Sequence, residues 1–347
     1  MIVERNYNYD LLRLLGLMVI MIAHSSPPGW LFQLRNFGTP LLVIGSALTY
    51  SYIFCCKPLD IRPFLKKRFT RLIFPLWFFL TFFFIIAFII TSFNKEFPFT
   101  VYQVVTSYFL FDGIGFVWVF KIYIFLALLT PLAIKFNKHV KSNSVYLSSI
   151  FLFYIGYEFL VLNFGGLSGS VHDVVINKFA FIMLPYALIY FYGFRLSKLS
   201  FNIVLFITLA SLITFLAMLL YKFHESGQFI PTQDYKYPPT LYYFSYALFC
   251  INSLYLIIVK ALNVGASLSK GIVWLSKNSL WIYLWHIAAF YIWYFSFPEP
   301  EGDIKLFVSK TLFLFFFSIL IVHLQNLLVM KLLILSPNKK RFVSLIF

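Results

Sequence analysis

The sequence predicts an all-α fold: a polytopic membrane bundle of about ten transmembrane helices, with both termini in the cytoplasm. Of its 347 residues, 61% are hydrophobic and only 12% are charged, and a soluble domain of this length cannot bury so much apolar surface. Runs such as 72–93 and 306–330 are long enough to cross a bilayer. They lack the alternation of polar and apolar residues found in the strands of membrane barrels, which favours helices.

Ten apolar stretches follow one another along the chain, and each is predicted to span the membrane. Their residues are 8–26, 36–55, 71–93, 114–134, 145–164, 175–195, 200–221, 240–260, 271–295 and 305–331. The apolar stretch 101–111 is too short to cross and is predicted to be interfacial or re-entrant. Because no segment between the spans is long enough to fold alone, residues 1–347 are predicted to form a single membrane domain.

The formal charge of +16 is distributed as membrane insertion requires, rather than as a nucleic-acid site. With the N-terminus inside, eighteen of the 28 Lys and Arg residues fall in cytoplasmic loops and seven, Lys310 among them, in outer loops; Arg13, Lys121 and Lys277 lie within spans. Lys and Arg gather on the cytoplasmic side of membrane proteins, so both termini are expected there and no nucleic-acid partner is needed. The three cysteines imply no disulfide.

The first apolar stretch also has features of a signal peptide. Its core, Leu14–Ala23, has the length of a signal-peptide core, and Ala23-His24-Ser25 loosely resembles a cleavage site. The histidine inside it and the prolines directly after it fit cleavage poorly. Its removal would also invert the orientation that the other nine stretches support, so we expect it to stay as a span.

Arg13 and His24 are polar residues in this first stretch. A charged side chain at a helix centre costs roughly 2.5–3.5 kcal/mol, which makes it a functional candidate. On a continuous helix the two residues lie about 20° apart and roughly 16 Å apart along the axis. Asp10, one turn before Arg13, is the expected partner of the arginine. The alternatives are a snorkelling anchor for Arg13 and a hydrogen-bonded interfacial role for His24.

Three further polar residues are predicted at the depth of His24: Lys121, Glu158 and His286. A buried carboxylate can orient a histidine and raise its basicity, and a lysine can stabilise developing negative charge. In the alternative reading, Glu158 and Lys121 pair with each other and His286 bonds a backbone carbonyl. Because the three residues are predicted at the same depth in the membrane as His24, a common site is favoured.

A basic segment precedes the third span. Arg68 and Arg71 are three residues apart at its start and therefore share a helix face, with Lys66 and Lys67 before them. Arginine pairs at a helix start suit phosphate recognition. For the two lysines, ordinary cytoplasmic basicity is the alternative.

Six segments, in order, resemble those of the acyltransferase-3 family of membrane acyltransferases. The first has the family's arginine, ten residues and histidine, here Arg13 and His24. The others are FGTPLLVIGSALTYSY (37–52), KKRFTRLIFPLW (66–77), FVWVFKIYIFLALLTPL (116–132), DYKYPPTLYYFSYAL (234–248) and NSLWIYLWH (278–286). The second departs from the Phe-rich stretch before Ser-Gly that many members have, and a family role for Lys121 is open. The C-terminal soluble esterase-like domain of some members is lacking here, which implies that transfer is completed in the membrane domain.

The resemblance implies an O-acyltransferase of the bacterial inner membrane that uses no metal. Such an enzyme moves an acyl group, commonly acetyl, from cytoplasmic acetyl-CoA to a hydroxyl of an extracytoplasmic or lipid-linked polysaccharide. Arg13, Arg68 and Arg71, with Lys67 beside them, would hold acyl-CoA. His24 would act as general base or carry the acyl group transiently, with His286, Glu158 or Lys121 orienting it or stabilising the oxyanion.

Aromatic residues of the predicted outer side, among them Tyr237 and Tyr242, are candidates for binding the sugar together with Lys121, although an interfacial aromatic belt is the alternative. A proton-coupled transporter of a lipid-linked sugar is the rival function, with His24, Glu158 and His286 relaying protons. Neither repeat symmetry nor matched broken helices support transport. A non-catalytic scaffold would leave the charges inside the spans unexplained. Consumption of acyl-CoA that depends on His24 distinguishes the enzyme from both.

Overall fold

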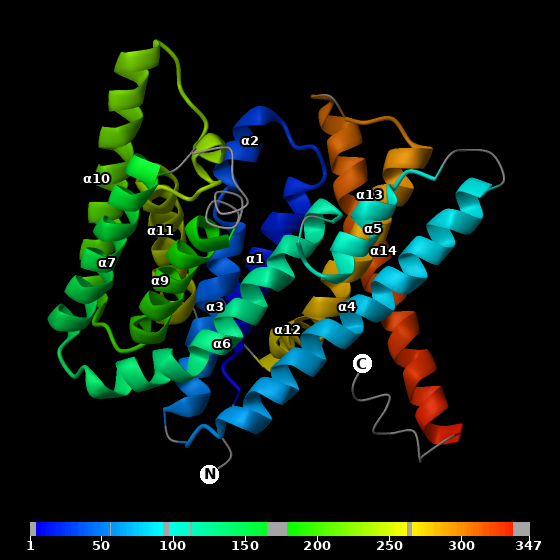
Figure 1. Ribbon diagram of the computed structural model, residues 1–347, viewed down its shortest axis with the longest axis horizontal. Coiled ribbons are helices and arrows are strands. Elements are labelled where there is room, and N and C mark those ends of the chain that lie inside the picture. The colour runs from blue at the N-terminus through cyan, green and yellow to red at the C-terminus, as the bar shows by residue number, and fades with distance from the viewer. Residues whose placement is uncertain are drawn as a thin grey trace. The chain divides into compact units, whose positions relative to one another are not determined.

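The computed structural model describes residues 5–55, 57–92, 97–111, 113–164, 179–261, 266–300 and 302–335. The described chain consists of helices joined by turns and loops, as the sequence predicts (Figure 1). It divides into two compact units. The first contains residues 1–23, 27–58 and 129–276, and the second contains residues 24–26, 59–128 and 277–347.

Three helices form the centre of the first unit: α1 (Tyr7–Ala23), α3 (Gly38–Phe54) and α9 (Phe181–Leu196). Helix α3 packs against both of the others (Figure 1). Glycines allow this close approach, because a Cβ built on Gly45 would lie 2.6 Å from Cγ of Arg13, and one built on Gly193 would lie 2.7 Å from Cβ of Ala47. In a bilayer, where lipid is as apolar as leucine, such close packing of small residues is a main source of helix association.

The remaining elements of the first unit surround this centre. They are α2 (Gly29–Leu34), the end of α6 (Trp118–His139), α7 (Asn143–Phe164), α10 (Phe201–Ser226), η3 (Thr232–Tyr235), α11 (Leu241–Tyr255), the π-helical turn η4 (Leu256–Ala261) and α12 (Ala266–Lys277). Helix α10 packs on α11, and α7 packs on α9. Helix α10 is capped at both ends: the hydroxyl of Ser200 accepts from the amide of Ile203 before its first turn, and Gly227 follows its last residue with a φ of 71°.

Arg195 connects the cytoplasmic ends predicted for three helices of this unit. Its side chain is almost fully buried and donates to the backbone oxygens of Asn137 and Val140 and to Oδ1 of Asn143. The last carbonyls of a helix lack partners within that helix, and α6 (Trp118–His139) ends here. Arg195 therefore satisfies the end of α6 besides contributing to the cytoplasmic charge excess that the sequence predicts.

The second unit contains α4 (Ile61–Ser92), α5 (Val101–Tyr108), η1 (Gly115–Val117), the start of α6, α13 (Ser279–Ser296) and α14 (Ile304–Leu335). Helix α13 packs on α14 and on α4 (Figure 1). The short α5 packs on α4, where Trp77 donates to the carbonyl of Tyr108 at 3.0 Å. A capping box between Thr100 and Gln103 starts α5. Its eight residues cover about 12 Å, too little to cross a bilayer, as expected for residues 101–111.

Seven helical segments of the described chain are long and apolar enough to cross a membrane. They are Gly29–Phe54, Ile61–Thr91, Gly115–His139, Asn143–Phe164, Phe201–Ser226, Leu241–Ala261 and Ile304–Ile334. Helix α9 is apolar but shorter, and part of the stretch 175–195 lies outside the described residues. The expected span 271–295 is interrupted, because α12 ends at Lys277 and α13 starts at Ser279. The all-helical, multi-pass class is confirmed, while the count of ten and the sides of the termini remain predictions.

Candidate functional site

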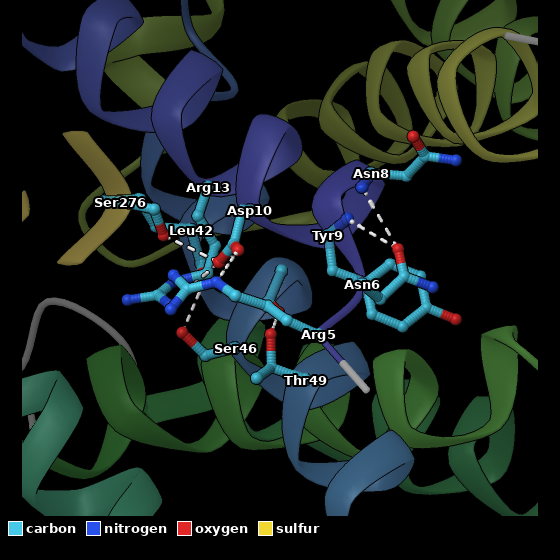
Figure 2. Close-up of polar contacts among 11 residues, drawn as sticks. Arg5, Asn6, Asn8, Tyr9, Asp10, Arg13, Leu42, Ser46, Thr49 and Ser276 are labelled. Carbon is cyan, nitrogen blue, oxygen red and sulfur yellow. Dashed lines mark hydrogen bonds and ion pairs between the residues drawn. The ribbon is translucent and has the colours of Figure 1, made fainter. Parts of the chain in front are cut away.

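A cluster of charges surrounds Asp10 on α1 (Figure 2). The carboxylate is buried and accepts hydrogen bonds from the guanidinium of Arg5 through Oδ2 and from the hydroxyl of Ser276 through Oδ1 at 2.7 Å. The predicted ion pair with Arg13 is present, with Nη1 of the arginine 3.9 Å from Oδ1. Asp10 thus pairs with two arginines and links α1 to α12 through its hydrogen bond from Ser276.

Arg13 retains an unused hydrogen-bond donor in this cluster. Its side chain passes over Gly45 of α3, about a quarter of it is exposed, and Nε is buried without a hydrogen-bond partner. The nearby Ser46 donates its hydroxyl hydrogen to the carbonyl of Leu42 at 2.9 Å (Figure 2). A guanidinium that is held on one side and has an unused N–H on another is suited to bind an anion.

The other predicted phosphate-binding residues lie on α4, in the second unit. Because α4 already begins at Ile61, Arg68 and Arg71 lie about two and three turns inside the helix, and their predicted position at a helix start is wrong. Arg68 is half-buried, with its guanidinium carbon 5.5 Å from the centre of the Phe64 ring. Arg71 and Lys67 are exposed. Arg13 belongs to the first unit, so the predicted acyl-CoA ligands are distributed over both units.

His24 and His286, two of the predicted catalytic residues, lie together in the second unit. Helix α1 ends one residue before His24, which therefore occupies the turn after the helix rather than its last turn. The two imidazole ring centroids are 5.5 Å apart. Phe116 flanks His24 at 4.6 Å between ring centroids, and Phe290 flanks it at 6.3 Å. The pair lies in a mostly aromatic environment.

The bonding of His286 defines its tautomer. The residue is fully buried on α13, and its Nδ1 bonds the carbonyl oxygen of Tyr283. Because a carbonyl only accepts, Nδ1 carries the proton and Nε2 has a lone pair. That Nε2 is buried and has no hydrogen-bond partner among the described residues. The alternative prediction, that His286 bonds a backbone carbonyl, is thus correct for Nδ1. Its Nε2 can still accept a proton.

A polar cluster beside the histidines was missed by sequence reasoning. Lys310 of α14 is fully buried rather than in an outer loop. Its Nζ lies 2.6 Å from Oε2 of Glu299 and donates to the hydroxyl of Ser26 at 3.1 Å. Ser26 donates to the same carboxylate oxygen at 2.9 Å and lies two residues after His24. The available signal was a lysine within the apolar run 305–331, but its position near the start of that run placed it among the outer-loop residues.

Glu158 and Lys121 were predicted to act beside His24, but the structure shows each of them bonded to a backbone group. Oε1 of Glu158, on α7, accepts from the amide of Leu241 at 3.0 Å, which is one of the unbonded amides at the start of α11. Lys121, in the first turn of α6, donates to the carbonyl of Phe111 at 3.0 Å. Glu158 belongs to the first unit and Lys121 to the second. These hydrogen bonds support structural roles for both residues.

The two tyrosines predicted to bind sugar differ in exposure. Tyr242 is buried, with its hydroxyl donating to the carbonyl of Ile230 at 2.9 Å and its ring stacked on Phe215 at 5.5 Å. Tyr237 is 48% exposed. Of the two, Tyr237 has a ring surface that a ligand can reach. Within the described ranges, no three His, Cys, Asp or Glu side chains come close enough to hold a metal ion.

A family model described as "Acyltransferase domain" matches residues 6–324, nearly the whole chain. This range includes Arg13, His24, His286, Glu299 and Lys310. No curated protein and no solved structure matches the chain.

Proposed function

The chain belongs to the acyltransferase-3 family, and on that premise we propose that it is an O-acetyltransferase of the bacterial inner membrane. It moves an acetyl group from cytoplasmic acetyl-CoA to a hydroxyl of an extracytoplasmic or lipid-linked polysaccharide. The observation that carries this proposal is the histidine pair, with ring centroids 5.5 Å apart and Nε2 of His286 able to accept a proton.

The acyl donor binds through its phosphates. Arg13, with its unused Nε–H, and Arg68 and Arg71 on α4 supply guanidinium groups, which suit phosphate oxygens better than ammonium groups do. Lys67, directly before Arg68 in the sequence, adds a further positive charge. The exposed side chains of Arg71 and Lys67 are accessible to the anionic donor from solution.

His24 provides the base for the chemical step. Its imidazole takes the proton of the acceptor hydroxyl while that oxygen attacks the thioester carbonyl, so a C–O bond forms and the C–S bond breaks. The CoA thiolate that leaves takes the proton from the imidazolium. A transient acyl-imidazole on His24 is the two-step form of the same reaction. His286 shares the proton or orients the neighbouring ring through its Nε2.

Release of thiol from acetyl-CoA by the protein in nanodiscs, with glucose and glucuronic acid oligosaccharides supplied as acceptors, tests this proposal. His24→Ala should lower the rate by about 100-fold or more, the usual contribution of a positioned base. His224→Ala is the matched control, because His224 is exposed in the last turn of α10 and should leave the rate unchanged. Equal rates in the wild type and His24→Ala, both above the protein-free rate, would contradict the proposal. Movement of a lipid-linked sugar without thioester cleavage would favour the rival transporter.

A further inference from the structure

A second polar cluster lies in the first unit, where the turn after α2 meets the loop between α10 and α11. It consists of Arg35, Asn36, Gln233, Lys236 and Thr240, which we name the Arg35 cluster. Hydrogen bonds between the neighbouring chain segments hold the cluster in place. The side-chain amide of Asn36 donates to the hydroxyl of Thr232 at 3.0 Å, and the hydroxyl of Tyr246 donates to the carbonyl of Leu34 at 2.7 Å.

Two cations are buried in the Arg35 cluster. Arg35 and Lys236 are each only 8% exposed, and a buried arginine normally has a counter-charge. The guanidinium of Arg35 lies over the Phe32 ring, 3.7 Å from its centroid, and pairs with no carboxylate of the described chain. Burial, and to a lesser extent the nearby Arg35, lowers the pKa of Lys236 to about 7. Because like charges in an apolar setting are costly, a negative group beside Arg35 would stabilise the cluster.

The cluster also contains buried polar atoms that have no hydrogen-bond partner. They are Nε of Arg35, Oδ1 of Asn36, Oε1 of Gln233 and Oγ1 of Thr240. Such atoms are rare in folded proteins, and several in one place indicate that a ligand completes their bonds. One is an N–H donor, two are amide oxygens that only accept, and the hydroxyl can do either. A molecule with both hydroxyl groups and a negative charge matches this set.

An aromatic surface adjoins these polar atoms. Tyr237 is 48% exposed, its ring lies 5.3 Å from Nζ of Lys236, and the charge of Arg35 acts on its hydroxyl. Lys222 at the end of α10 lies over the ring of Tyr235, 3.8 Å from its centroid. The exposed ring of Tyr237 beside these cations suits a sugar ring that carries an acidic group, because the apolar face of the sugar stacks while the acid binds the cation.

We propose that the Arg35 cluster binds an anionic saccharide, and hence that the acceptor of the proposed acyl transfer carries a carboxylate or a phosphate. Arg35 and Lys236 bind the acidic group, the oxygens of Asn36 and Gln233 accept from sugar hydroxyls, and Tyr237 covers one face of the ring. This inference rests on the proposed function for the identity of the ligand as acceptor. The binding itself does not depend on acyl transfer.

Binding is measured without acetyl-CoA, by isothermal titration of the protein in phosphatidylcholine nanodiscs. The probes are a glucuronic acid oligosaccharide, glucose 1-phosphate and a neutral glucose oligosaccharide. We expect one or both anionic probes to bind and the neutral probe to bind at least about tenfold more weakly. Arg35→Gln should weaken the anionic probe about 10-fold or more, whereas Lys305→Gln, which removes an exposed charge at the start of α14, should not.

Several outcomes would overturn the proposal. They are equal affinity for charged and neutral probes, no binding of any probe, and an Arg35→Gln variant that is monodisperse and binds like the wild type. Arg35→Lys keeps the charge and should retain more affinity than Arg35→Gln, which separates ligand binding from a folding defect.

The two anionic probes distinguish a carboxylate from a phosphate. Loss of binding to both in nanodiscs with anionic phosphatidylglycerol would assign the cluster to lipid headgroups and overturn the proposal. Thiol release that fails while these probes still bind would refute only the proposed function.

Discussion

Lys310 is an unusual residue for its position, because a fully buried ammonium must be balanced within the protein. Its bonds to Glu299 and Ser26 do this, and its Nζ lies 4.9 Å from the centroid of Phe290, the ring that also flanks His24. Ser26 has a φ of 55°, a left-handed conformation that a non-glycine residue adopts at some energetic cost. These contacts fix the turn that carries His24.

Lys310→Met is therefore expected to lower both stability and activity. Removing one partner leaves the Glu299 carboxylate unbalanced, a loss of about 3 kcal/mol, at the low end for buried pairs because Glu299 is partly exposed. The double variant Lys310→Met with Glu299→Met should regain much of the thermal stability but not the rate, since Ser26 still lacks its partners. Thermal unfolding and thiol release measure the two effects, with Lys305→Met as control. A Lys310→Met protein as active as the wild type would refute the positioning role.

Lys236 gives the Arg35 cluster a dependence on pH. Its pKa of about 7 means that the side chain is charged below pH 7 and neutral above it in the free protein. The charged and titratable groups that act on it or share its cluster are Arg35 and Tyr237, and burial raises the pKa of Tyr237.

Affinity for the glucuronic acid oligosaccharide, whose carboxylate stays ionised over this range, should accordingly be constant below about pH 7 and fall as the pH rises above it. The sign follows because an anion binds the protonated lysine better than the neutral one. Binding titrations from about pH 6 to about pH 9 measure this change, since they cover the pH range in which the lysine loses its proton. Lys236→Arg should remove the dependence, and an affinity that rises with pH in the wild type would contradict the role of Lys236.

At the scale of elements, α3 is the helix on which the first unit depends. It contacts α1 through Gly45 and α9 through Ala47, which faces Gly193. The two glycines face different neighbours. A Cβ on Gly45 would meet the side chain of Arg13, whereas one on Gly193 would meet Ala47 and, at 3.2 Å, the backbone of Ile44.

The two glycines should consequently respond differently to alanine. Gly193→Ala must push two helices apart and should lower the stability by about 1–3 kcal/mol. Gly45→Ala should displace the Arg13 side chain, raising the KM for acetyl-CoA more than it lowers the stability. Gly156→Ala on α7, with nothing within 4 Å of the added Cβ, is the control. Thermal unfolding and steady-state kinetics distinguish the cases, and identical behaviour of all three variants would rule out these packing roles.

The break between α12 and α13 is an element boundary that local sequence does not reveal. Residues 271–275 and 280–295 are largely apolar on either side of the polar run Ser276-Lys277-Asn278-Ser279, and mean hydropathy over the whole stretch predicts one span. In the structure Asn278 lies between two helices and its amide oxygen accepts from Asn326 at 3.0 Å. The polar run is a local signal for a break, but the hydrogen bond from Asn326 that satisfies Asn278 comes from a distant helix and is not visible in local sequence.

At the scale of the whole molecule, composition and long apolar runs were sufficient to predict a multi-pass helical membrane protein. The motif of Arg13 and His24 was sufficient to indicate the family. The angular positions of residues on the first helix could not show that His24 lies beside His286. That contact depends on the packing of segments that are distant in the sequence. Lys310 was assigned to a loop because its position close to a helix start resembles an anchor; burial and the Glu299 pair correct this. The Asp10 partner of Arg13 was predictable because it is local.

The predicted orientation applies to the whole chain and can be tested by cysteine labelling. In a variant without the three native cysteines, Ser226→Cys, at the end of α10, should react with an impermeant maleimide added to intact cells. Ser142→Cys, in the turn before α7, should react only after lysis, because the excess of Lys and Arg places that loop inside. The reverse pattern would invert the orientation and place the acyl-CoA arginines on the wrong side.

The acetyl group itself can be followed in oriented proteoliposomes, which tests acyl transfer across the membrane without an indirect readout. Radiolabelled acetyl-CoA is supplied on the cytoplasmic face only, and the anionic saccharide that binds best is supplied on the opposite face. We predict label on the saccharide in the wild type and none with His24→Ala, while His224→Ala behaves as the wild type does. Thiol release with no label on any saccharide or lipid-linked sugar of the opposite face, or labelling that persists in His24→Ala, would contradict the proposed transfer.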